Sequence, residues 1–98
     1  MVMATETLTL IDFYSLACAP CKLLMPVLDK IETDYKNVLQ LRKIDVCKDI
    51  ATASKYMIIS IPTIILTNGS ILAVWRGSNV RQIEQDIRRR VVRYLVAP

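Results

Sequence analysis

Cys18 and Cys21 are separated by Ala19 and Pro20, and the pair lies between an apolar, strand-like run and a helical pattern. Two thiols at this spacing, at the start of a helix, can close a small disulfide ring and open it again. The positive end of the helix dipole favours the thiolate that the attacking sulfur must carry. The pair therefore predicts thiol–disulfide exchange, with Cys18 as the nucleophile and Cys21 as the thiol that resolves the mixed disulfide.

Two other interpretations of the cysteine pair stay open, namely inert core cysteines and a metal or cluster site. A closed zinc site needs four ligands, and the chain has three cysteines and no histidine. A metal would therefore require a second copy of the chain, and we expect no metal and no bound cofactor. The lack of histidine also excludes Ser/His/Asp and Cys/His catalysis.

Asp12 is a carboxylate inside an otherwise apolar strand-like run. Burying an unpaired carboxylate is costly, and desolvation raises its pKa towards neutrality. A carboxyl group with such a pKa can exchange a proton near neutral pH. The alternative is an aspartate at a sheet edge that turns to solvent.

The hydrophobic pattern predicts the elements that position these residues. Strands are expected at residues 8–14, 38–46, 61–67 and 71–76. Helices are expected at residues 18–35, at about 50–57 and after the break at 77–79. The first two strands are separated by a helix and must run parallel, whereas Asn68-Gly69 predicts an antiparallel hairpin. The fold class is therefore α/β, with a mixed central sheet of about four strands and helices on both faces.

Length and charge narrow the class of protein. At 98 residues, the chain is predicted to form a single domain over residues 1–98. The formal charge is +4, and arginines crowd near the C-terminus. A nucleic-acid surface and a solvated helix face both fit them, and we favour the second, because the helix dipole attracts cations to its C-terminal end. These arginines are Arg81, Arg88, Arg89, Arg90 and Arg93.

The sequence predicts no membrane span, since no run approaches the required length of about 18 apolar residues. The apolar stretch at 8–14 lacks the basic leader of a secretory signal. An odd number of cysteines also argues against the disulfide framework of a secreted protein. We therefore expect a cytoplasmic location, where a Cys-x-x-Cys pair is more often catalytic or metal-binding than structural.

Several landmarks in register resemble the thioredoxin family over roughly residues 8–95. They are the strand at 10–15, the motif Cys18-Ala19-Pro20-Cys21-Lys22, Pro26 inside the helix, Lys55-Tyr56, Ile61-Pro62-Thr63, and the later glycines Gly69 and Gly77. The resemblance implies a thioredoxin-like fold and the reduction of protein disulfides by dithiol exchange. It also implies disulfide-containing protein substrates and a separate reductase as electron donor, for a protein that we expect to be a monomer.

The resemblance also implies roles for individual residues. Asp12 would accept the proton of Cys21, directly or through water, and Lys43 would be the lysine beside this buried acid. A plain surface lysine at position 43 is an equally good interpretation. Pro62 would be a cis proline, with the backbone of Ile61 free to pair with an extended substrate. The predicted substrate-binding residues are Ala17, Ala19, Pro20, Ile61 and Pro62.

The chain departs from the family pattern at three places. Ala17 stands where tryptophan is usual, and Ala19 where glycine is usual. Only about seven residues precede the first strand, so we expect the strand at 38–46 to be an exposed edge. The bare surface around Ala17 and Pro62 leaves a second hypothesis open, a binding module without enzymatic activity. The third thiol, Cys47, is expected to be small and half-buried.

Overall fold

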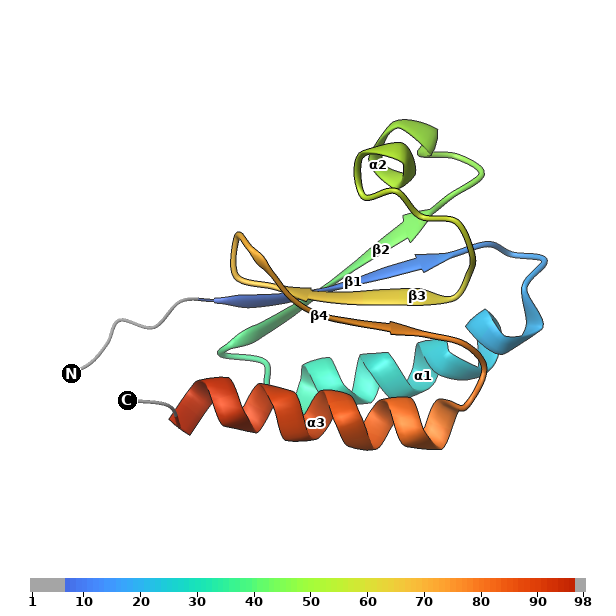
Figure 1. Cartoon of the computed structure of the whole chain (residues 1–98). Coiled ribbons are helices and arrows are strands. Elements are labelled where there is room, and N and C mark those ends of the chain that lie inside the picture. Colours follow the sequence, from blue (N-terminus) through green and yellow to red (C-terminus); the bar gives the residue numbers. More distant parts are fainter. Residues whose placement is uncertain (1–6, 97–98) are drawn as a thin grey trace.

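The computed structural model describes residues 7–96, which form four strands and three helices in the expected order (Figure 1). The strands are β1 (Leu8–Tyr14), β2 (Leu39–Asp45), β3 (Thr63–Thr67) and β4 (Ile71–Arg76). The helices are α1 (Ala19–Asp34), α2 (Ile50–Lys55) and α3 (Val80–Val96). Across residues 7–96, no helix is both long and apolar enough to cross a membrane.

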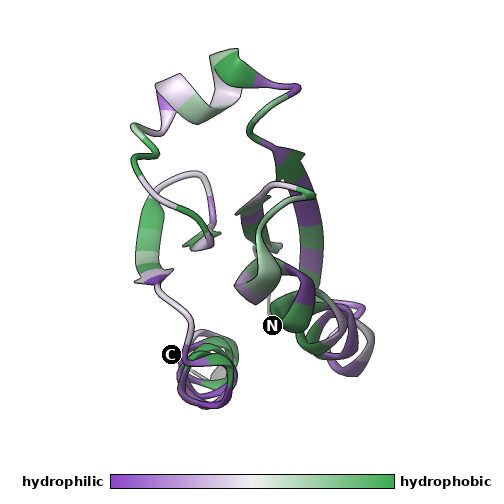
Figure 2. Ribbon diagram, turned by 90° about the vertical axis from the view of Figure 1, so that its right-hand side faces the viewer, coloured by the Kyte–Doolittle hydropathy of each residue, from purple (hydrophilic) through white to green (hydrophobic). Residues whose placement is uncertain are grey.

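The strands form one mixed sheet in the order β2-β1-β3-β4. β1 runs parallel to β2, with Leu8 opposite Leu39, and antiparallel to β3, with Leu10 opposite Leu66. β4 returns antiparallel to β3. The expected mixed sheet is confirmed, and within the described residues β2 is an edge strand. Figure 2 shows hydrophobic and hydrophilic residues alternating along β2, as the exposure of Gln40 and the burial of Leu39 also indicate.

Helices cover both faces of the sheet, as expected. α1 and α3 lie side by side on one face, and α2 lies on the other (Figures 1 and 2). An ion pair of 2.9 Å between Arg88 of α3 and Asp34 of α1 joins the two neighbouring helices. The larger hydrophobic cluster fills the space between them and the sheet. Its buried members are Leu8, Leu10, Leu24, Leu28, Ile31, Leu39, Ile64, Leu66, Ile83, Ile87 and Val91.

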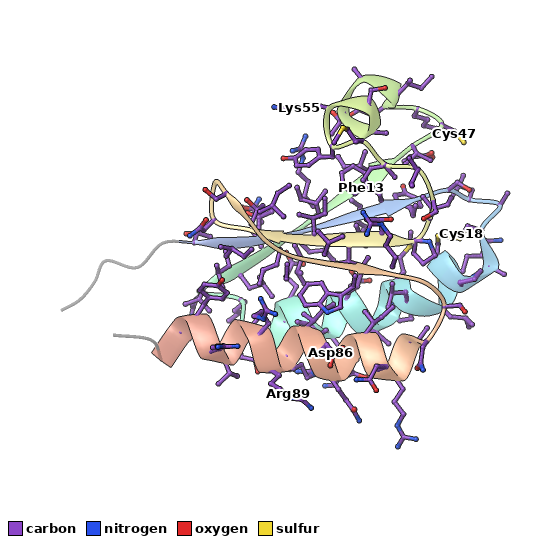
Figure 3. All side chains as sticks on the ribbon, viewed as in Figure 1. Phe13, Cys18, Cys47, Lys55, Asp86 and Arg89 are labelled. Atoms are coloured by element: carbon purple, nitrogen blue, oxygen red, sulfur yellow. A yellow bond between two sulfur atoms is a disulfide. The ribbon has the colours of Figure 1, made fainter. Side chains whose placement is uncertain are left out.

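A smaller cluster covers the face of the sheet that bears α2. Its buried members are Ile11, Phe13, Ile44 and Ile65. The ring of Phe13 lies 5.5 Å from that of Tyr56, the residue that follows α2 (Figure 3). Because side chains alternate along a strand, Leu10 and Asp12 of β1 point to the α1 face, whereas Ile11 and Phe13 point to the other. The alternation thus directs a carboxylate to the side of the sheet on which the cysteine helix packs.

The connection between β3 and β4 and the end of α2 differ from the predicted boundaries. β3 ends at Thr67 and β4 begins at Ile71, so the connection spans 68–70 and is longer than a two-residue Asn-Gly turn. A register shift at Leu66/Thr67 and a φ of +111° at Gly69 accompany it, which is typical of a hairpin loop with a bulge. α2 ends at Lys55 and not near residue 57, because Met57 takes a φ of +53°, outside the right-handed helical region.

Candidate active site

Cys18 and Cys21 form a disulfide at the start of α1, with their Cα atoms 5.3 Å apart. Cys18 is the N-cap residue, with extended backbone angles, and the helix begins one residue later than the expected position 18. Pro20 lies in the first turn, where its missing N–H group removes no intrahelical hydrogen bond. The junction between β1 and α1 thus brings both sulfur atoms to one end of the helix (Figure 3).

The two cysteines differ in exposure. Cys21 is 1% exposed, whereas Cys18 is half-buried. The backbone N–H of Cys21 donates a hydrogen bond of 3.3 Å to Sγ of Cys18. A free N–H group of the first helical turn therefore points at the sulfur that is more accessible from solvent, and such a donor stabilises a thiolate.

Asp12 is completely buried, which rules out the alternative of an edge aspartate turned to solvent. Neither carboxyl oxygen has a hydrogen-bond partner among residues 7–96. Burial raises the pKa of Asp12 from its ordinary value of 3.8 to about 6. The positive charge of Lys43 opposes this rise in the pKa, and the negative charge of Asp29 adds to it. The side chain is thus a carboxyl group that can exchange a proton near neutral pH.

Lys43 stands beside the buried acid and also reaches solvent, so both interpretations of this residue hold in part. It is the register partner of Asp12 across the parallel β1–β2 pair. Its Nζ atom lies 2.9 Å from Oδ1 of Asp29 on α1, and its side chain is 39% exposed. The hydrogen bond to Asp29 raises the pKa of Lys43 above its ordinary value. The sequence carried no signal for Asp29, because helix packing alone brings it to β2.

The Ile61-Pro62 peptide bond is cis, as expected. Pro62 is buried, Ile61 is half-buried, and Oγ1 of Thr63 donates a hydrogen bond of 2.7 Å to the Ser60 carbonyl in the same loop. Because Thr63 is the register partner of Phe13, this loop enters the sheet at the end where β1 leads into α1 (Figure 1). The proline loop and the disulfide thus share one end of the molecule.

The remaining predicted residues surround this end. Ala17 and Ala19 are exposed, and Pro20 is half-buried. The expectation of a half-buried Cys47 is wrong: its thiol is free and exposed. Cys47 lies in the turn between β2 and α2, where its backbone N–H donates to Oδ1 of Asp45 and its side chain leaves the sheet (Figure 3). Within residues 7–96, no three side chains of the metal-binding types come close enough to hold a metal ion.

The family model called Thioredoxin matches residues 1–89. This match covers most of the chain, which therefore belongs to the thioredoxin family, and it confirms the resemblance predicted from the motifs. A thioredoxin of Staphylococcus aureus is 42% identical over 57 residues, which are 58% of this chain and 55% of that protein. The matched region thus spans about half the length of the curated relatives.

Solved structures confirm the expected thioredoxin-like fold. The germline-specific thioredoxin protein Deadhead of Drosophila melanogaster superposes with a TM-score of 0.78 at 25% identity, over 86% of this chain and 81% of that one. A mutant thioredoxin of Halobacterium salinarum NRC-1 gives a TM-score of 0.79 at 27% identity, over 96% of this chain and 80% of that one.

Proposed function

We propose that this protein is a thiol–disulfide oxidoreductase that reduces protein disulfides through Cys18 and Cys21. One observation supports this most strongly: the two sulfur atoms are bonded at a helix start, with the more accessible one accepting the N–H of Cys21. Membership of the thioredoxin family supports the same activity. The proposal places the protein in the cytoplasm as a monomer, with a separate reductase as electron donor and no nucleic-acid or membrane partner.

In the reduced protein, the Cys18 thiolate attacks one sulfur of a substrate disulfide. A bond forms between Cys18 and that sulfur, the substrate disulfide breaks, and the other substrate sulfur leaves as a thiolate. Cys21 then attacks Sγ of Cys18, which forms the intramolecular disulfide and releases the second substrate thiol. Two electrons pass to the substrate in each cycle, and the reductase returns two electrons to Cys18 and Cys21.

Asp12 is the proposed proton acceptor for Cys21, with Lys43 as its charged neighbour. Burial disfavours a thiolate at Cys21, which is 1% exposed, so its attack on Cys18 requires a base. A carboxyl group with a pKa of about 6 can take the thiol proton near neutral pH, directly or through water. The same carboxyl group can return the proton when the reductase reduces the disulfide.

The proposed substrate surface consists of the loop before α1 and the cis-proline loop. Ala17, Ala19 and Pro20 line the approach to Cys18, and the backbone of Ile61, beside Pro62, is the proposed pairing edge for an extended substrate segment. The small exposed side chain at Ala17 leaves this surface without an aromatic anchor. We therefore expect the substrate range to depend on the loop residues and not on one dominant side chain.

The test is insulin reduction with dithiothreitol, and it compares the natural chain with Cys18→Ser and Cys21→Ser. Cys18→Ser is expected to abolish the stimulation of turnover. In a separate reaction without dithiothreitol, the previously reduced Cys21→Ser variant is expected to hold insulin as a mixed disulfide, which non-reducing electrophoresis resolves. Cys47→Ser is the matched control, because it removes an exposed thiol outside the pair and is expected to leave the rate unchanged. Equal rates of insulin reduction for the natural chain and Cys18→Ser would rule out the proposed enzymatic activity.

A docking module without redox activity is the second candidate. Exposed apolar side chains support it, since Leu16 beside the motif is 64% exposed and Ile59 before the proline loop is 88% exposed. Such residues suit a dedicated protein partner. Thiol titration separates the two candidates, because a module without redox activity is expected to have no thiol of low pKa at Cys18.

A further inference from the structure

Lys43 lies between two carboxylates that come from different elements. Across the parallel sheet it is the register partner of Asp12, and its Nζ atom is 2.9 Å from Oδ1 of Asp29 on α1. Alternation along β2 assigns Lys43 to the same face as Leu39 and Leu41, which pack in the cluster beneath α1. The three charged side chains thus occupy one region between the β1–β2 pair and the outer side of α1.

The two carboxylates differ in their surroundings. Asp12 is 0% exposed and has no hydrogen-bond partner among residues 7–96, whereas the side chain of Asp29 is 52% exposed. A lysine next to a buried carboxylate ordinarily pairs with it, because an unpaired buried charge is costly. Here the ammonium group makes its short contact with the outer partner. Lys43 is therefore held at the rim of the site, while Asp12 is left without a hydrogen bond to it.

We propose that Asp29 is a positioning residue for the dithiol exchange, because it holds Lys43 away from Asp12 and so keeps the buried carboxyl able to accept a proton. The inference rests on the proposed function, in which Asp12 accepts the proton of Cys21. Asp29 contacts no reacting atom and acts through the place at which it fixes the ammonium group.

The electrostatics of the site agree with this geometry. The charge of Lys43 lowers the pKa of Asp12, and the charge of Asp29 raises it. Glu32, one turn after Asp29 on α1, also acts on Lys43, and its Oε2 atom accepts the backbone N–H of Leu41 at 2.7 Å. On the other side of Asp12, the register partner on β3 is Ile64, which carries no charge. The net effect on Asp12 therefore depends on where the ammonium group of Lys43 sits.

The test follows the titration of the Asp12 carboxyl group in the oxidised protein by the NMR chemical shift of its carboxyl carbon. The pH at the midpoint of this titration is the quantity compared between variants. Asp29→Asn frees Lys43 to approach Asp12, so the Asp12 midpoint is expected to fall. Lys43→Gln removes the positive charge, so the midpoint is expected to rise. Asp34→Asn is the matched control, the same substitution on the same helix at a carboxylate that pairs with Arg88 instead, and it is expected to leave the midpoint unchanged.

The double variant distinguishes positioning from a direct charge effect. If Asp29 acts mainly through Lys43, Asp29→Asn lowers the midpoint clearly more in the natural chain than in the Lys43→Gln background, where only the direct charge effect of Asp29 remains. Equal shifts in both backgrounds, or no shift in the natural chain, would overturn the proposal. Asp29→Glu keeps a carboxylate within reach of Lys43 and is expected to restore the natural midpoint, which a role in folding alone would not explain.

These measurements use no substrate, so the proposal and the function on which it rests fail separately. If the natural chain does not reduce insulin, the proposed function falls, whatever the Asp12 titration shows. If insulin is reduced, the pH profile of the rate adds a second readout. The limb controlled by Asp12 is expected to move to lower pH in Asp29→Asn and to higher pH in Lys43→Gln. A limb that stays in place in both variants would contradict a positioning role.

Discussion

The backbone N–H of Cys21 donates a hydrogen bond to Sγ of Cys18 over 3.3 Å, and the donor residue is itself the second member of the disulfide. Because Cys18 is the N-cap of α1, this N–H is one of the helix-start groups that lack an intrahelical acceptor. When the disulfide opens, the same group remains available to a thiolate at Cys18. The capping geometry that starts the helix thus also favours the charged form of one of the two sulfur atoms.

This contact predicts unequal reactivity of the two thiols. In a reduced Cys47→Ser variant, iodoacetamide is expected to label Cys18 well before Cys21, because Cys18 is more exposed and its thiolate is stabilised by the helix start. Peptide mapping by mass spectrometry at short times gives the order. The unfolded chain in urea is the control and is expected to label both at similar rates. Faster labelling of Cys21 in the folded protein would contradict the prediction.

The buried Asp12 predicts that stability falls as the pH rises. Between 3.8 and about 6, the folded protein keeps on Asp12 a proton that the unfolded chain has released. The folded state then binds more protons, so the free energy of unfolding decreases with pH, by a total of about 3 kcal/mol. Asp12→Asn is expected to remove this part of the pH dependence. Its stability relative to that of the natural chain is therefore expected to be greater above a pH of about 6 than below pH 3.8.

Urea denaturation of the oxidised natural chain and of Asp12→Asn, on both sides of the window, checks this prediction. The difference in stability between the two proteins is the informative quantity, because other titrating groups cancel in it. A difference that does not change with pH would show that Asp12 titrates alike in both states.

Two leucines on α1 predict opposite outcomes for the same substitution. Leu28 is 0% exposed in the core beneath α1, and Leu23 is 67% exposed on the same helix. Leu28→Ala is expected to lower the free energy of unfolding by about 2–5 kcal/mol, since it leaves a cavity. Leu23→Ala, the control, is expected to change it by less than about 0.5 kcal/mol. Urea denaturation of both variants measures the contrast, and similar losses would contradict the packing described above.

The edge strand β2 predicts a role for Glu32 in protecting a backbone group. Its Oε2 atom accepts the N–H of Leu41 at 2.7 Å, on the edge of the sheet within the described residues. Glu32→Ala is expected to speed hydrogen exchange at the Leu41 amide and to cost about 1–2 kcal/mol, since charged acceptors make stronger hydrogen bonds. Glu32→Gln keeps a neutral acceptor, so its exchange rate at the Leu41 amide and its loss of stability are expected to lie between those of the natural chain and of Glu32→Ala. Unchanged exchange at Leu41 in Glu32→Ala would mean that the amide is protected by other means.

Much of the fold could be predicted because local signals agreed with one another. The apolar runs, Pro20 at a helix start, and the Asn68-Gly69 break gave the order of strands and helices correctly. Boundaries moved where backbone geometry, and not hydrophobicity, ended an element, as at Met57 with its φ of +53° and at the bulge before Asn68. The residue at which such an element ends depends on the register with a neighbouring strand or on a single backbone torsion angle. Neither of these can be read from the hydrophobic pattern of the sequence.

The amino-acid sequence alone determined which residues form the candidate site, because two thiols three positions apart at a predicted helix start, with a carboxylate in the preceding strand, can be recognised from type and spacing. Tertiary structure decided what surrounds that chemistry. β1 is apolar towards both faces, so periodicity could not say which face covers Asp12. Packing of α1 on β2 brought Asp29 to Lys43, and the turn after β2 exposed Cys47. Contacts between elements that are distant in the sequence determine which charged groups lie beside these side chains and how far the side chains are exposed. These contacts exist only once the chain has folded.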